Sequence, residues 1–380
     1  MVHRMPLRML AGLLLGAIVG GAHLYTHETV PQFSDWVQDW AYNEIAAWHD
    51  GRAIAPTAAY SYSYGSACGI GYYTHHPLLA SYVGLAAEEL LGVSPQRAIA
   101  AGLALSAAVL VYLLTMRRSI RAGLVISGAI VASLYAAPGY AKWLHHPIGD
   151  TWSVASLYLI GCAGLARRPI RWMTIVCFVA GWVSINLTCV FAGMVAGVLF
   201  AAQGFGRTTW YAAGAAIVAF CTANLLHLAQ VWCHFGWDWS MVVADYFIGL
   251  PDNGSQTSVL LRVTGLPLSA RLAAAGQSLS AYWDEAMTNQ HGEWTTPLWW
   301  ALLPVWSVAV PRTGRGIVGA AVMIAGAAST AVIAPGLLPP HLHYLPRYVV
   351  ITCLGALVCC AVAPTSDELD RVVPTAAGSD

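Results

Sequence analysis

Apolar runs of about 20 residues recur along the whole chain, and few charged residues interrupt them. A helix of that length crosses the hydrocarbon core of a bilayer, where the backbone must satisfy its own hydrogen bonds. The composition agrees: 58% of residues are hydrophobic and 9% charged, against about 45–50% and about 25% in soluble domains. The pattern predicts an all-α, polytopic membrane protein with about ten transmembrane helices. The expected spans lie near 7–26, 97–115, 119–138, 150–166, 171–187, 189–205, 209–230, 294–311, 316–335 and 346–364.

Arginine residues fall at every second break between these spans and set the expected topology. They include Arg4, Arg8, Arg117, Arg118, Arg121, Arg167, Arg168, Arg171, Arg207, Arg312 and Arg315. Because basic residues mark cytoplasmic loops, both termini and the short turns are expected in the cytoplasm. The long loops 27–96 and 231–293 then belong to the outer face. We expect one integral membrane domain over 1–364 and a short, disordered cytoplasmic tail over 365–380.

The most polar interval of the chain runs from Phe33 to Leu79, in the first outer loop. Within it, the segment Asp39–Gly51 has apolar residues at helical spacing, which suits a short helix on the membrane surface. Such outer interfacial helices would hold Asp39 at the bilayer boundary. An acid there can act as a general base toward an acceptor hydroxyl or amine, or bind a divalent cation. The alternative is an ordinary solvated carboxylate.

The triplet His-His-Pro occurs twice on the expected outer face, each time shortly before an apolar helix. The pairs are His75 with His76 and His145 with His146. Proline suits the first turn of a helix, so each pair lies where a helix N-terminus favours an anion such as phosphate. Packing of the helix start at the interface explains the same pattern without a ligand, and ligation of a metal is a further alternative.

Three more charged residues occupy helix starts or loops on the same face. Asp150 opens an apolar helix, where a carboxylate is either a functional group or a helix cap. Arg347 begins the last span against the positive-inside trend, and it can hold a phosphate in bidentate fashion or extend into the headgroups. Lys142 is a weaker candidate for the same role.

The run Tyr60–Tyr73 alternates tyrosine with serine and glycine. It suits a flexible loop whose tyrosines stack on a sugar or polyol, and equally a simple lid. The formal net charge of zero gives no indication of a nucleic-acid partner.

The order of these elements resembles the N-terminal half of the C-type glycosyltransferase (GT-C) superfamily. The resemblance covers about residues 30–170. It rests on Asp39, on Tyr73-Thr74-His75-His76-Pro77, on Arg97 at the start of the next span and on Asp150 in the next outer loop. Arg347-Tyr348 resembles the Arg-Tyr that opens a late span in many members. The protein O-mannosyltransferase and lipid A aminoarabinose transferase branches are the most similar in pattern.

This resemblance implies transfer of a sugar from a polyprenyl-phosphate donor to a lipid, glycan or protein acceptor at the outer membrane face. Asp39 and Asp150 are then the catalytic acids, and the same two residues are the expected ligands of any divalent cation, Mg²⁺ or Mn²⁺. The donor and acceptor would be bound by residues of both outer loops and of the last span. They are Tyr73, His75, His76, Lys142, His145, His146, Arg347 and Tyr348. The implied location is a bacterial inner membrane, with the active face toward the periplasm or the cell exterior.

Three other functions fit parts of the pattern. Trp40 follows Asp39 where the family usually has Glu, and Leu78 follows Pro77 where it has Pro, which favours a non-catalytic subunit of a membrane assembly. A transporter would be expected to carry ionisable groups within its spans. An outer-face metalloenzyme would use the histidine pairs.

Overall fold

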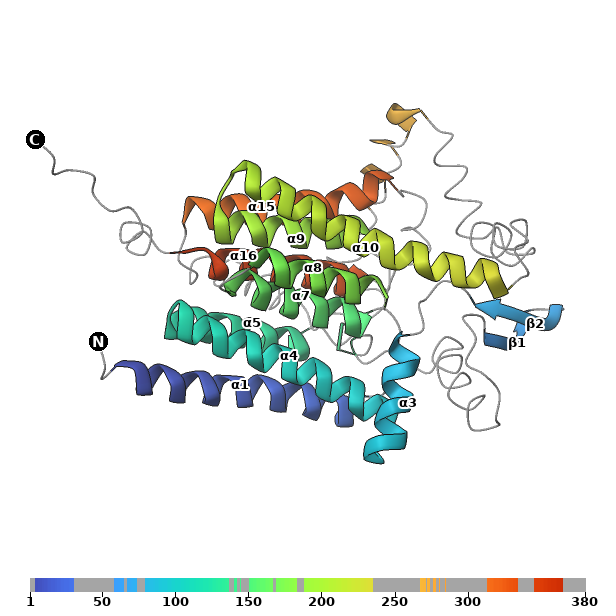
Figure 1. The fold of residues 1–380 in the computed structure, drawn as a ribbon, viewed down its shortest axis with the longest axis horizontal. Helices are drawn as coiled ribbons and strands as arrows, with labels where there is room; N and C mark the ends of the chain where they lie inside the picture. Colours follow the sequence, from blue (N-terminus) through green and yellow to red (C-terminus); the bar gives the residue numbers. More distant parts are fainter. Residues whose placement is uncertain are drawn as a thin grey trace, which may run out of the picture.

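The computed structural model describes residues 4–30, 58–64, 67–73, 79–136, 150–166, 169–182, 188–234, 313–333 and 345–364, with a few positions inside 140–144 and 267–284. Within these residues, nine helices form a bundle (Figure 1). They are α1 (Arg4–Thr29), α4 (Pro95–Arg117), α5 (Ile120–Ala136), α7 (Asp150–Leu165), α8 (Pro169–Gly181), α9 (Thr188–Gln203), α10 (Arg207–His234), α15 (Gly314–Ile333) and α16 (Leu345–Val362).

The helical class expected from the sequence is confirmed, and each expected span except 294–311 coincides with one of these helices. The span 294–311 lies outside the described residues. Among the described residues, three helical stretches are long and apolar enough to cross a membrane: Pro6–Thr29, Pro95–Arg117 and Arg207–His227. The other apolar helices are shorter in their described parts. Together with the composition, these helices indicate an integral membrane protein.

Contacts between helix ends fix the direction in which the helices run. Nη1 of Arg117 donates a hydrogen bond to the carbonyl of Leu165 at 2.9 Å, and Nε of Arg118 donates one to the carbonyl of Val362 at 2.8 Å. Leu165 and Val362 are the last residues of α7 and α16, so α4, α7 and α16 all end at the same side of the bundle. We call this side, which contains Arg117, Arg118 and Arg315, the arginine end.

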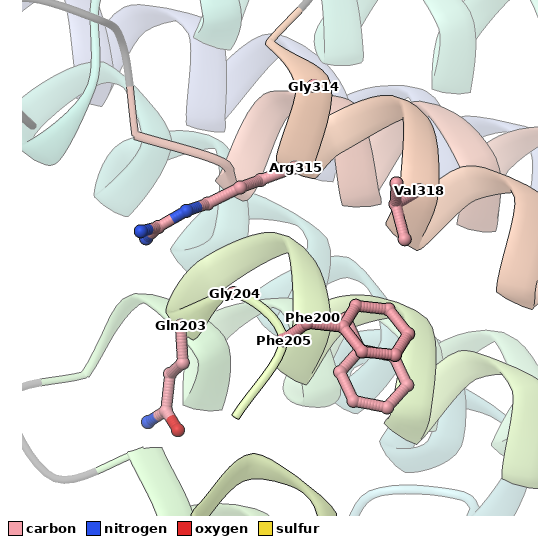
Figure 2. Close-up of a pocket in the computed structure, with 7 residues that line it drawn as sticks. All are labelled: Phe200, Gln203, Gly204, Phe205, Gly314, Arg315 and Val318. Carbon is pink, nitrogen blue, oxygen red and sulfur yellow. The ribbon is translucent and has the colours of Figure 1, made fainter. Parts of the chain in front are cut away.

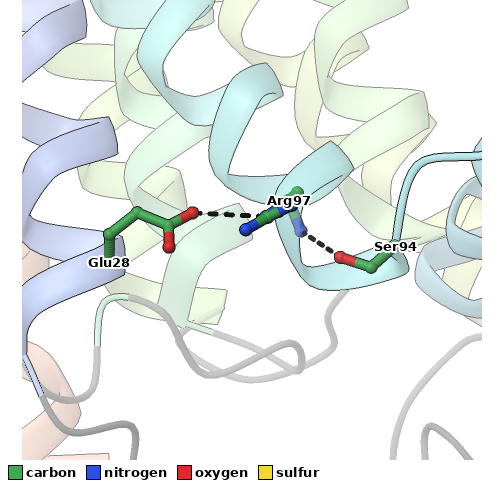
Figure 3. A network of polar contacts seen from close by, with 3 residues as sticks. All are labelled: Glu28, Ser94 and Arg97. Atoms are coloured by element: carbon green, nitrogen blue, oxygen red, sulfur yellow. Dashed lines mark hydrogen bonds and ion pairs between the residues drawn. The ribbon is translucent and has the colours of Figure 1, made fainter.

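The opposite side, the distal end, is where α1 finishes and α4 begins (Figure 3). Nε of Arg97 lies 3.3 Å from Oε1 of Glu28. Because both side chains are more than half exposed, this ion pair contributes little stability. Ser94 caps α4, its Oγ accepting a hydrogen bond from the Arg97 N–H at 3.5 Å, and Pro95 supplies the first residue.

A further helix, α3 (Leu79–Leu91), crosses the bundle direction at the distal end (Figure 1). Gly92 follows it with φ +62°, a left-handed conformation that glycine adopts without a steric penalty. This residue lets the chain turn from α3 directly into α4. Leu90 and Leu91 at the end of α3 are 80% and 73% exposed, as expected for an interfacial helix whose apolar side chains meet lipid.

Residues 58–64 and 67–73 form the two strands of an antiparallel hairpin instead of the flexible loop that the sequence suggested. Strands β1 (Ala58–Tyr64) and β2 (Ala67–Tyr73) pair along their whole length, at the distal end of the bundle (Figure 1). The alternation of tyrosine with serine has the period of a strand, in which every second residue shares a face. In this register Tyr60, Tyr62 and Tyr64 pair with Gly71, Gly69 and Ala67.

Glycines allow α9 and α15 to approach backbone to backbone. A Cβ on Gly197 would lie 2.6 Å from the carbonyl oxygen of Gly319, and a Cβ on Gly193 would lie 3.0 Å from the Cα of Gly326. Gly193 and Gly197 form a Gly-x-x-x-Gly pair, the spacing that puts two small residues on one helix face. Because lipid offers helices no hydrophobic driving force, such close van der Waals packing is a main source of association.

Replacing Gly197 by valine should therefore destabilise the bundle. Overpacking of this kind costs about 1–3 kcal/mol, and thermal unfolding of the detergent-purified protein, followed by size-exclusion chromatography, measures the loss. Gly214→Val on α10 is the matched control, because nothing lies within 4 Å of the position of its Cβ. Equal melting temperatures for the two variants would contradict the packing described here.

Candidate functional site

Six of the predicted site residues lie outside the described residues: Asp39, His75, His76, Lys142, His145 and His146. The other four lie in described elements, and the structure gives the backbone position of each of these residues. Asp150 is the first residue of α7, Arg347 and Tyr348 are the third and fourth residues of α16, and Tyr73 is the last residue of β2. The predicted roles of all ten residues remain predictions.

The first turns of α7 and α16 lie at the same end of the bundle. The two helices pack against each other, and both finish at the arginine end, where Arg117 and Arg118 bind their last carbonyls. They have 16 and 18 residues, which at about 1.5 Å per residue gives similar lengths of roughly 24 and 27 Å. Asp150 and Arg347 therefore both begin their helices at the distal end.

The local sequence explains why both helices start where they do. Pro346 occupies the first turn of α16, where its missing N–H is no loss. Asp150 is the first residue of α7, a position at which the helix dipole favours an acidic residue. Two helix N-termini at one end of the bundle provide N–H groups and positive dipole ends that favour an anionic group between them.

A buried polar cluster lies below the distal end, and the sequence analysis did not identify it. His23 on α1 and Tyr158 on α7 are each 0% exposed. Nε2 of His23 lies 3.3 Å from the Tyr158 hydroxyl, and the two rings meet edge to face with centroids 5.9 Å apart. Tyr140, also buried, lies next to Tyr158. The sequence signal was available: a histidine inside an apolar span is costly and marks a functional candidate.

The depth of this cluster follows from its place on the two helices. His23 precedes the end of α1 at Thr29, and Tyr158 follows Asp150 on α7. At about 1.5 Å per residue, both groups lie roughly 10 Å inside the bundle from the distal end. Within the described part of the chain, Nδ1 of His23 has no hydrogen-bond partner. The hydrogen bond between His23 and Tyr158 links α1 to α7, and Nδ1 of His23 can still form a hydrogen bond to one further polar group.

The structure does not test the expected divalent cation. Among the described residues, no three His, Cys, Asp or Glu side chains come together as a metal site. Asp39 lies outside these residues, and of Asp150 only the backbone is described. Binding of Mg²⁺ or Mn²⁺ by the two acids therefore stays a prediction.

Comparison with known proteins gives no match. No family model, no curated protein and no solved structure is significantly similar to this chain. The resemblance to the C-type glycosyltransferases therefore rests on the sequence pattern alone.

Replacing Tyr158 by phenylalanine should destabilise the protein, because Nε2 of His23 would then be left without its partner in an apolar interior. The expected loss is about 1–3 kcal/mol. A double-mutant cycle with His23→Leu measures the coupling between the two side chains, which should be about 1 kcal/mol. Additive losses in thermal unfolding would show that the pair contributes no interaction of its own.

Proposed function

We propose that this protein is an integral membrane glycosyltransferase of the C-type architecture, with about ten spans, that uses a polyprenyl-phosphate-linked sugar. Both termini lie in the cytoplasm, and the reaction takes place at the distal end, on the outer face of the membrane. The observation that carries the proposal is the common end at which α7 and α16 begin. Asp150 and Arg347 are 197 positions apart in the sequence, yet both lie in the first turn of a helix that begins at this end of the bundle.

In the proposed reaction the acceptor attacks the anomeric carbon of the sugar directly. Asp39 takes the proton from the acceptor hydroxyl or amine as the new bond to the anomeric carbon forms. The bond from that carbon to the phosphate oxygen breaks, and the polyprenyl phosphate leaves with the electron pair. Asp150 orients the acceptor or a divalent cation.

Cationic and polar groups stabilise the leaving phosphate. Arg347 binds it through its guanidinium fork, because two parallel N–H groups match two phosphate oxygens. Lys142 and the two histidine pairs add donors, and the starts of α7 and α16 add the positive ends of their dipoles. Tyr73 and Tyr348 provide aromatic faces for the sugar. The basic groups thus act where negative charge develops.

Asp39→Asn should lower the rate of sugar transfer about 100- to 10,000-fold, the usual contribution of a general base. The assay follows consumption of a radiolabelled polyprenyl-phosphate sugar by membranes that contain the protein and its natural acceptors. Glu28→Gln is the matched control, because it removes a carboxylate at the same end that is exposed and paired with Arg97. Normal turnover by the Asp39 variant would exclude this residue as the base.

Arg347→Gln should both raise the KM for the donor and lower kcat, because the guanidinium binds the phosphate in the ground state and more strongly as negative charge develops on it. Arg347→Lys should recover part of the affinity, since it restores the charge without the fork. Titration of the donor in the same assay separates the two constants. A KM that is unchanged in both variants would remove Arg347 from the donor site.

The buried His23–Tyr158 pair favours one other candidate function. Polar and ionisable groups inside a helical bundle are typical of transport paths, and this pair lies in the interior between α1 and α7. Uptake of a labelled solute by the purified protein in liposomes, abolished by His23→Leu, would support a transporter over a transferase.

A further inference from the structure

A pocket opens at the arginine end, on the side of the bundle opposite the proposed reaction site. Its volume is about 230 Å³. It lies where α9 ends and α15 begins, and the end of α9, the turn at Gly204 and Phe205, and the first turns of α15 form its walls. Its lining includes Phe200, Gln203, Gly204, Phe205, Arg315 and Val318.

The pocket has a polar side and an apolar side (Figure 2). The guanidinium of Arg315 and the amide of Gln203 extend toward the same side. Phe200 and Phe205 occupy the other side, with their rings stacked 4.3 Å apart at an angle of 13°. Trp210 packs edge-on against Phe200, with the ring centroids 4.7 Å apart. A ligand that fits both sides must carry a charged group next to an apolar one.

Gly204 allows Arg315 to lie close to the backbone. The glycine ends α9 with φ +81°, which a residue with a side chain rarely adopts. A Cβ at this position would also lie 3.1 Å from Cζ and from Nε of Arg315. The turn between α9 and α10 therefore provides a surface against which the guanidinium rests, and this limits the conformations of the side chain.

Arg315 differs from Arg117 and Arg118, which lie at the same end. Arg117 and Arg118 bind the last carbonyls of α7 and α16, whereas no carboxylate or carbonyl partner of Arg315 occurs within the described ranges. Helices α10 and α15 both begin beside it, and their positive dipole ends add to its charge. The polar side of the pocket thus suits an anion, and a guanidinium is well matched to a phosphate.

The surface around the pocket is apolar. Phe205, Trp210 and Tyr211 are 64%, 56% and 77% exposed, and Ile317 on α15 is 52% exposed. In a membrane protein, aromatic side chains at the end of a bundle lie at the level of the lipid headgroups. The apolar side of the pocket is therefore adjacent to residues that contact lipid, which favours a lipid over a soluble anion.

We propose that this pocket binds the phosphate group of an anionic phospholipid from the leaflet at the arginine end. The guanidinium of Arg315 and the amide of Gln203 donate hydrogen bonds to the phosphate oxygens. The glycerol and the first acyl carbons lie against Phe205 and Val318. Basic pockets between transmembrane helices on the cytoplasmic side bind lipid headgroups in this way. The site is independent of the proposed transferase activity.

Native mass spectrometry of the full-length protein in detergent tests the proposal. The protein is titrated with phosphatidylglycerol and, separately, with zwitterionic phosphatidylcholine. The wild type should bind phosphatidylglycerol more tightly, and Arg315→Gln should weaken that binding about tenfold, as expected for the loss of one charged contact to the headgroup. Arg315→Lys, which keeps the charge and the apolar stem, should have intermediate affinity and serves as the second variant if Arg315→Gln does not fold.

Arg8→Gln is the matched control. It removes the same charge near the start of α1, and α1 packs mainly on α4 and α5, away from the pocket. Affinity unchanged in Arg8→Gln and lowered in both Arg315 variants would support the site. Equal losses in Arg8→Gln and Arg315→Gln, or undiminished binding by the Arg315 variants, would overturn it. Displacement of phosphatidylglycerol by millimolar inorganic phosphate would assign the pocket to a soluble anion and overturn the lipid assignment.

Discussion

Two hydrogen bonds from neighbouring arginines to helix ends organise this bundle. The last carbonyls of a helix have no partner within the helix, and in an apolar surrounding each unpaired group costs free energy. Arg117 and Arg118 satisfy the final carbonyls of α7 and α16 from the end of α4. These contacts align three helices at the arginine end. As a consequence, Asp150 and Arg347 both start their helices at the opposite end, where the proposed chemistry takes place.

The two ends of the bundle differ in chemistry. The distal end carries α3, the β1–β2 hairpin and the starts of α4, α7 and α16, whose dipoles have their positive ends there. The arginine end has short connections and a pocket lined by one guanidinium. Sugar transfer at one end and anchoring by a phospholipid at the other would use opposite faces of a single rigid bundle.

Much of the fold was predictable because the rules for membrane helices are local. Length and hydropathy identify a span without reference to any other span, and arginines identify the ends of α4, α10 and α15. The hairpin was missed because its tyrosines alternate with serine and glycine, a composition that is equally typical of loops. The candidate site was predictable only as a set of residues on the outer face, since the sequence does not indicate that α7 and α16, which carry Asp150 and Arg347, are neighbours.

The sequence by itself determined that the chain is helical and suited to a bilayer, and which residues lie at each end of a span. The tertiary structure decided which helices are neighbours. His23 and Tyr158 are 135 positions apart, and Arg118 and Val362 are 244 apart. The same applies to the close approach of Arg315 to the turn at Gly204. Such pairs depend on the packing of small and large side chains between helices, and a pattern read along one helix does not contain that information.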